Sequence, residues 1–249
     1  MQSCTDNLVY TGADIEVVLT GNTYKAAFTE SSPVSTFNSG NQILLNASGS
    51  LQIDSRILTY MDNQWKAENE FSWSDLTGKT NVTAVYPVYP DLDYVQENLY
   101  KNNSLEDILY VKDEFPAGNS IHLQFKHLFS LLTLHLEGNL QTYFQKIEVT
   151  CPAVSSIIPK SAEIVPADNE TYTTTIAQVS PSGNYSFIVP PVKNMVIAIN
   201  MVTNGKKYTT QLETKSFTGN KEYTYHLKIS EKTPGIMTAE DWIAFSQLI

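Results

Sequence analysis

Residues 121–136 read IHLQFKHLFSLLTLHL, and the phase of their apolar side chains changes partway along. In the first part the apolar residues stand at odd numbers: Ile121, Leu123 and Phe125. In the second part the better register is even: Leu128, Leu132, Leu134 and Leu136. Because successive strand residues point to opposite faces, a phase change means that the buried face has switched. Either a β-bulge or a strand that passes from one sandwich into another would produce this switch.

Strand patterns continue on both sides of this stretch, whereas helical periodicity is scarce. Before it, period-two segments bounded by Gly, Asn, Asp or Pro predict strands at 15–19, 42–46, 56–61, 65–67, 81–86, 108–112 and 121–125. After it, the same signals predict strands at 130–136, 146–150, 172–177, 185–189, 196–202, 207–212 and 222–229. Two sets of similar size favour a domain crossing over a bulge. The crossing predicts that Phe125 and Leu134 belong to different hydrophobic cores.

The sequence therefore predicts an all-β protein with two antiparallel β-sandwich domains in tandem. The expected boundaries are 1–127 for the first sandwich, with 1–10 as a flexible tether, and 128–233 for the second. Residues 234–249 follow as a separate segment. Between two predicted strands, residues 91–105 are polar and irregular. We expect them to form a surface excursion with a short helix that uses Leu92, Val95 and Leu99.

Composition excludes several classes of function. Of 249 residues, 42% are hydrophobic and 17% charged, which supplies a sizeable core and argues against wholesale disorder. The net charge is -10 and the only arginine is Arg56, so nucleic acid and anionic membrane surfaces are unfavourable partners. Cys151 lies in a strand pattern and is expected to be a small buried hydrophobe rather than half of a disulfide with Cys4.

Catalytic and metal-binding motifs are missing. There is no Gly-x-Ser-x-Gly elbow, phosphate loop, dinucleotide glycine motif or zinc spacing. The four histidines are His122, His127, His135 and His226. Eight strand residues separate His127 from His135 by about 25 Å, which is too far for a shared metal. We expect each histidine to be structural, and we expect no enzyme activity, no cofactor and no metal.

Three aromatic residues could form a platform on which a sugar ring stacks: Tyr60, Trp65 and Trp73. Packing inside an aromatic-rich sandwich explains the same residues more simply. Both interpretations stay open at this point.

The two ends of the chain differ from its body. Residues 3–6 (SCTD) look like the end of a bacterial lipoprotein signal, so Cys4 is a candidate for lipidation, against the simpler interpretation of an ordinary near-terminal cysteine. At the other end, residues 238–241 (TAED) resemble a capping box. Trp242, Phe245 and Ile249 then fall on one helical face, and this apolar end would be better buried, on the body or by a partner.

Several segments, taken in order, resemble the fimbrillin-like proteins of Bacteroides-type bacteria, which include type V pilus subunits and related lipoproteins. The segments are 24–29 (YKAAFT), 37–43 (FNSGNQI), 58–60 (LTY) with Trp65, Trp73, 82–87 (VTAVYP), 123–132 (LQFKHLFSLL), 187–191 (FIVPP) and 217–225 (FTGNKEYTY). No single segment is specific, but the ordered set runs over most of residues 10–230.

This resemblance implies two transthyretin-like sandwich domains, export as a lipoprotein anchored through Cys4, and a place on the outer surface of a Gram-negative cell. It also implies assembly by strand exchange, in which a protease removes the first strand and a partner's strand refills the groove. The implied cut falls near Lys25 and Ala26, where this chain has Lys in place of the family's Arg. The implied donor is the segment with Trp242, Phe245 and Ile249.

The function implied is that of a non-enzymatic fimbrial subunit or accessory adhesin. Its partners would be other subunits or copies of itself, the outer membrane and surface ligands of a host or another bacterium. The alternative is a glycan-binding outer-surface lipoprotein that uses Tyr60, Trp65 and Trp73.

Overall fold

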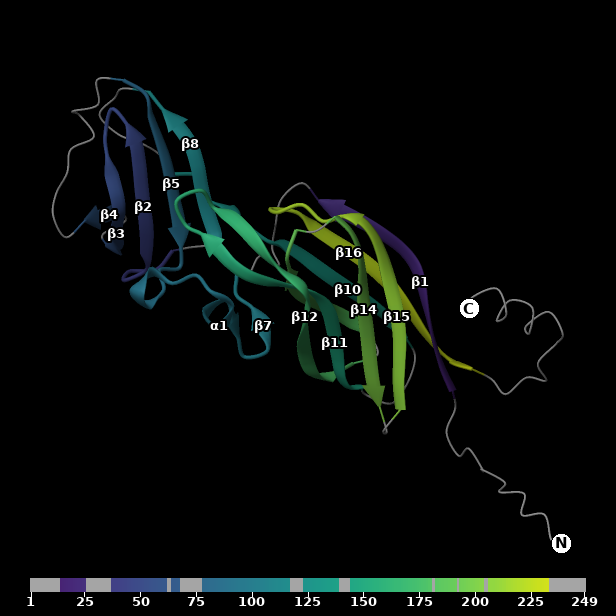
Figure 1. The fold of residues 1–249 in the computed structure, drawn as a ribbon. Helices are drawn as coiled ribbons and strands as arrows, with labels where there is room; N and C mark the ends of the chain where they lie inside the picture. The colour runs from purple at the N-terminus through teal and green to yellow at the C-terminus, as the bar shows by residue number, and fades with distance from the viewer. Residues whose placement is uncertain are drawn as a thin grey trace, which may run out of the picture.

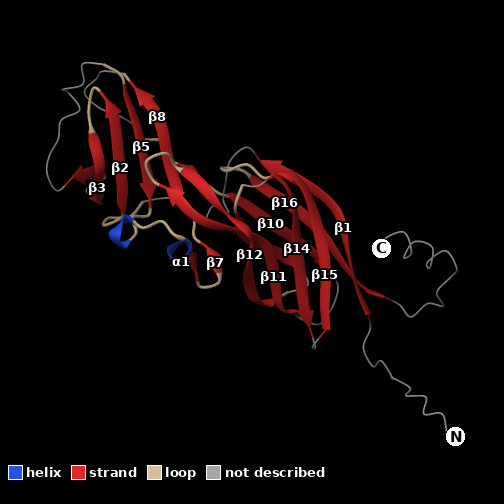
Figure 2. Ribbon diagram, in the orientation of Figure 1, coloured by secondary structure: helices blue, strands red, loops and turns tan. Residues whose placement is uncertain are grey.

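A computed structural model describes residues 14–25, 37–61, 64–67, 78–116, 123–138, 144–180, 182–191, 193–203 and 206–232. Strands dominate it and helix is confined to two single turns, which confirms the all-β class (Figure 2). Within these residues, no helix is long and apolar enough to cross a membrane. The predicted segments 238–241 and 242–249, together with Cys4, Ala26 and Trp73, lie outside the described residues.

The first half of the chain builds one six-stranded sheet, in the order β4-β3-β2-β5-β8-β9. Its strands are β2 (Gln42–Gly49), β3 (Ile53–Met61), β4 (Gln64–Ala67), β5 (Thr80–Tyr86), β8 (Leu109–Phe115) and β9 (Lys126–His127). β3 and β4 form a hairpin, because Met61 pairs with Gln64. All neighbours in this sheet are antiparallel.

The second half builds two sheets that face each other as a sandwich. One has the order β12-β11-β14-β15, with β11 (Phe144–Ile158), β12 (Glu163–Val179), β14 (Lys193–Thr203) and β15 (Lys206–Ser216). The other has the order β1-β16-β10-β13, with β1 (Asp14–Lys25), β10 (Ser130–Gly138), β13 (Gly183–Val189) and β16 (Glu222–Lys232). Figure 1 places the six-stranded sheet at one end of the molecule and this sandwich at the other.

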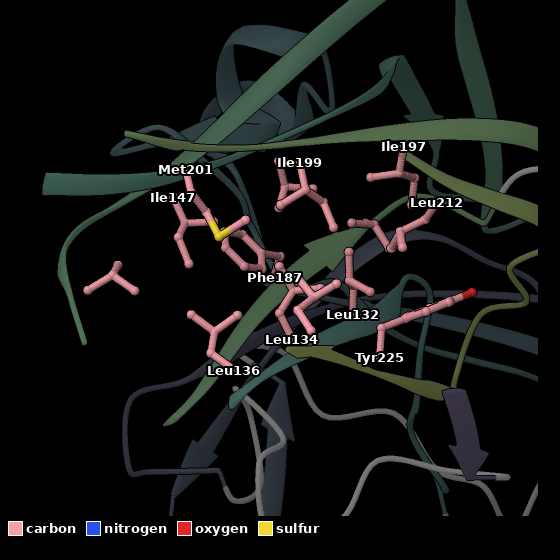
Figure 3. Close-up of a cluster of buried hydrophobic side chains, with 14 of the residues drawn as sticks. Leu132, Leu134, Leu136, Ile147, Phe187, Ile197, Ile199, Met201, Leu212 and Tyr225 are labelled. Atoms are coloured by element: carbon pink, nitrogen blue, oxygen red, sulfur yellow. The ribbon is translucent and has the colours of Figure 1, made fainter. Parts of the chain in front are cut away.

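The sandwich is filled by alternate residues from both sheets. Leu132, Leu134 and Phe187 from one sheet meet Ile147, Ile199 and Met201 from the other, as Figure 3 shows. All six side chains are at most 1% exposed. Cys151 lies in the same cluster as a free thiol, as expected for a small buried hydrophobe. Burial raises the pKa of this thiol to about 12, so it carries no thiolate at neutral pH.

Two pairings differ from the expected arrangement. β1, which lies inside the predicted first domain, pairs with β16 and so belongs to the sheet of the second half. β10 and β16 run parallel, and every other strand pair of the described residues is antiparallel. A parallel pair requires a long crossover, here residues 139–221, which contain all four strands of the opposite sheet. A tandem division at residue 127 stays a prediction, since β1 reaches across it.

Residues 91–105 do not form the expected surface excursion. They contain a 3₁₀ turn (Pro90–Leu92), helix α1 (Gln96–Leu99) and the hairpin of β6 (Tyr100–Lys101) with β7 (Ser104–Leu105). Tyr94, Leu99 and Leu105 are at most 2% exposed and pack against Val154 and Ile157 of β11. The Tyr100 hydroxyl accepts a hydrogen bond from the Val154 amide at 2.9 Å. The expected helix with Leu92, Val95 and Leu99 on one face is also not formed. α1 is a single turn that begins after Val95, and Val95 is 37% exposed.

The stretch 123–136 crosses three hydrophobic clusters in succession. Phe125 packs on the cluster of the six-stranded sheet. Leu128, Phe129 and Leu131 enter the intermediate cluster that also contains Leu99 and Ile157. Leu134 lies in the sandwich core, so the prediction that Phe125 and Leu134 occupy different cores is confirmed. Leu128 lies outside that core, in the intermediate cluster. The strand predicted at 121–125 is not present at residues 123–125, and the strand that forms here is the two-residue β9. An extended loop alternates its side chains as a strand does, so period two alone predicted the wrong element.

A tight turn at residues 218–221 holds this crossing in place. The Asn220 amide donates to the Phe129 carbonyl at 2.9 Å, and the Leu131 amide donates to the Lys221 carbonyl at 3.0 Å. The His127 amide donates to Asn220 Oδ1 at 3.2 Å. Gly219 approaches so closely that a Cβ there would lie 2.4 Å from the Leu128 carbonyl oxygen. Only glycine fits between this turn and the crossing.

The close approach of Gly219 predicts a large effect for a single methyl group. Gly219→Ala should destabilise the fold by roughly 1–3 kcal/mol or more, because backbone must shift to relieve the overlap. Gly78→Ala is the matched control: its Cβ would meet only Ser50 Cβ at 3.8 Å, an ordinary contact. Urea unfolding of both variants measures the difference. Equal stability of the two variants would contradict the close packing.

Candidate assembly edge and aromatic cluster

β1 forms the edge of its sheet, with β16 as its single neighbour in the strand order. The two strands pair antiparallel from Asp14 opposite Lys232 to Lys25 opposite Glu222. One irregularity, between Leu19 and Gly21, interrupts the register. An edge strand is held by one ladder only, so it can be exchanged for another strand without opening the rest of the sheet.

One face of β16, the strand that pairs with β1, is part of the sandwich core. Tyr225, Leu227 and Ile229 alternate along β16 and are at most 7% exposed, and the strand predicted at 222–229 is confirmed. Val17 and Leu19 lie opposite Ile229 and Leu227 in the register. The register therefore sets apolar β1 positions opposite buried apolar positions of β16.

A buried carboxylate lies at the far end of this pairing. Glu222 is 4% exposed, and its Oε1 accepts a hydrogen bond from the Thr133 hydroxyl at 3.1 Å. Lys25 stands directly opposite Glu222 in the register. A buried carboxylate is costly without a compensating charge, so the residue at this register position matters for the stability of the edge. Sequence reasoning did not single out Glu222, because a polar residue in an alternating strand pattern is expected to face solvent.

The aromatic residues proposed as a sugar platform belong to a packed cluster. Tyr60 on β3 and Trp65 on β4 are register partners with ring centroids 5.0 Å apart. Phe37 meets the Trp65 ring edge-on at 5.0 Å and also contacts Tyr86 and Phe125. These edge-to-face contacts are typical of core packing. Both Tyr60 and Trp65 are half-buried.

A separate hollow of about 740 Å³ is lined by residues of β2, β3, β5 and β8 in the six-stranded sheet and by the turn between β11 and β12. Asn46, Asn81 and Lys112 line it from the sheet, and Lys160 and Ser161 line it from the turn. Lys160 bridges to Asp54 at 2.8 Å and, with Ser55, lowers the pKa of that carboxyl. Neither Tyr60 nor Trp65 lines this hollow, and its lining contains no aromatic side chain from the described residues. The structure therefore does not join the platform to a cavity.

Of the residues predicted to carry function, the structure places Lys25 in the edge strand β1 and brings Tyr60 to Trp65. No described residue tests the lipidation of Cys4, the second processing position Ala26 or the third platform residue Trp73. The donor residues Trp242, Phe245 and Ile249 likewise lie outside the described part of the chain.

A family model described as fimbrillin-like matches residues 32–242. Among solved structures, a candidate cell adhesion protein from Bacteroides uniformis is similar with a TM-score of 0.55 at 12% identity, covering 79% of this chain and 91% of that one. A candidate cell adhesion protein from Bacteroides ovatus is similar with a TM-score of 0.54 at 13% identity, covering 79% and 87%. At such identities the likeness concerns the fold alone. Among curated proteins, none matches the chain in sequence.

The pairing of Lys25 with Glu222 predicts a charge-dependent edge. Lys25→Glu places two carboxylates opposite each other and should lower the free energy of unfolding by about 1 kcal/mol. It should also speed amide hydrogen exchange along β16. The double variant Lys25→Glu/Glu222→Gln should recover the loss, because the repulsion is gone and the amide oxygen still accepts from Thr133. Lys207→Glu, on an exposed position of β15 opposite Val202, is the control. A loss equal to that of the control would contradict the pairing.

Proposed function

The chain belongs to the fimbrillin-like family, and on that premise we propose that it is a non-enzymatic subunit of a cell-surface fimbria, or an accessory adhesin, that assembles by strand exchange. The names of the similar Bacteroides structures, which refer to cell adhesion, support the same class of function.

The observation that carries this proposal is the position of β1. It is the first strand of the described residues, it occupies a sheet edge, and it lies beside the buried row Tyr225, Leu227 and Ile229. Its removal would leave that row and the unpaired amide and carbonyl groups of β16 open. An extended strand from a second copy or another subunit satisfies both needs, with main-chain hydrogen bonds for affinity and apolar side chains for the groove.

Processing after Lys25 would release β1 whole, because Lys25 is its last residue. A cut there needs a protease that accepts lysine. The proposed donor is residues 242–249, in which Trp242, Phe245 and Ile249 supply the apolar side chains. Lipidation at Cys4 would hold the unprocessed chain at the outer membrane until assembly.

Limited digestion with a lysine-specific protease tests strand exchange. Mass spectrometry identifies chains cut after Lys25, and light scattering after size-exclusion chromatography measures their size. Cut chains should form multimers, and removal of residues 234–249 should leave cut chains monomeric because the donor is missing.

Lys25→Gln is the control for this digestion, since it blocks the cut and should keep the protein monomeric under the same protease. The proposal fails if correctly cut wild-type chains stay monomeric and cells without the protein keep normal fimbriae.

The alternative function is glycan binding through Tyr60, Trp65 and Trp73. The packing of Tyr60 and Trp65 on Phe37 favours a structural role for two of these three residues. A glycan array separates the functions: saturable binding that Trp73→Ala abolishes would support the alternative.

A further inference from the structure

Two histidines and a glutamate meet on the outer face of the sheet formed by β1, β16, β10 and β13. His135 and Glu137 are two residues apart on β10, so their side chains project to the same side. The residues that flank His135 on β10, Leu134 and Leu136, face the sandwich core. His226 on β16 is the register partner of His135 in the parallel pair. The side chains of both histidines are 35% exposed and that of Glu137 is 51% exposed, which leaves the cluster open to solvent.

The distances within this cluster suit a small metal ion. Nε2 of His135 lies 3.5 Å from Glu137 Oε1, and Nδ1 of His226 lies 3.4 Å from the same oxygen. All three ligand atoms lie within 4.8 Å of one another. A tetrahedral Zn²⁺ with bonds of about 2.0–2.1 Å holds its ligand atoms about 3.3 Å apart. Two edges of such a tetrahedron are therefore nearly in place. We propose that His135, Glu137 and His226 bind a divalent transition metal of the Zn²⁺ type.

A neighbouring amide prepares His135 for this role. Oδ1 of Asn184, the register partner of His135 on β13, lies 2.5 Å from His135 Nδ1. An amide oxygen can only accept, so Nδ1 carries the hydrogen and donates it. The lone pair is then on Nε2, the nitrogen that faces Glu137. Metal-binding histidines commonly donate their second ring N–H in this way, which fixes both tautomer and orientation.

The donor set selects the class of metal. Two imidazole nitrogens and one carboxylate suit Zn²⁺, Cu²⁺ or Ni²⁺, whereas Ca²⁺ and Mg²⁺ prefer oxygen ligands. The one carboxylate leaves a net charge of +1 on the bound centre, and the solvent-exposed side supplies water as fourth ligand. Lys228, the exposed register partner of Glu137, is a neighbouring cation that would weaken the site without blocking the imidazoles.

Binding would join β10 to β16 across their parallel ladder. β16 is also the strand that holds β1, so the ion would stiffen the strand that bears the assembly edge. The metal site itself does not depend on strand exchange, and its test is separate.

Isothermal titration of the full chain with zinc chloride is the test. Wild-type protein should bind one ion saturably, and His226→Ala and Glu137→Gln should lose that binding. Asn184→Ala should weaken it by about tenfold, because it frees the ring of His135 without removing a ligand. Co²⁺ in place of Zn²⁺ should give visible absorption bands in wild type that disappear in His226→Ala.

Glu163→Gln, an exposed carboxylate change on β12 in the opposite sheet, is the control and should bind Zn²⁺ as wild type does. Circular dichroism checks that each variant is folded. Unchanged Zn²⁺ affinity in folded His226→Ala, or Ca²⁺ binding as tight as Zn²⁺ binding, would overturn the proposal.

Discussion

The fold depends on the hydrogen-bonded contact between the crossing at residues 127–131 and the turn at 218–221. At this point the chain leaves one hydrophobic cluster and enters the next, so its backbone groups would lose their partners without a second segment alongside. Asn220 provides both a main-chain donor and a side-chain acceptor there. His127 adds a contact to Asp107 at 2.9 Å, between side chains that are only 11% and 3% exposed. A turn ninety residues away in sequence thus completes the crossing.

Much of this architecture could be predicted from local patterns. Alternation predicted the strands of both halves, and the change of phase before Leu132 predicted separate cores for Phe125 and Leu134. What failed was anything that depends on which segments meet. The segment that contains Tyr94 and Leu99 was predicted to lie on the surface. It is buried because Val154 and Ile157, from the far end of a long hairpin, pack against it. The placement of β1 beside β16 could not be read from either strand alone, since alternation reports a buried face and not a neighbour.

Because local patterns do not show which strands are neighbours, they also did not show that His135 lies beside His226. Along the sequence, His135 was compared with His127, and their separation on one extended chain excluded a shared ligand. The relevant neighbour is His226, which the parallel pairing of β10 with β16 brings alongside. Glu222 is a similar case: its buried carboxylate accepts a hydrogen bond from Thr133, which lies 89 residues away in sequence. Parallel pairs join residues far apart in sequence, so they create juxtapositions for which no sequence spacing exists.

The antiparallel pairing of β1 with β16 also has a mechanical consequence. Asp14 and Lys232 lie opposite each other, so the chain enters β1 and leaves β16 at the same end of the ladder. Tension between these two points would peel β1 from β16 one hydrogen bond at a time, which needs little force. Tension applied between Lys25 and Lys232, at opposite ends, would load all the bonds together in shear. A strand in this groove is therefore weak or strong according to the end from which it is pulled.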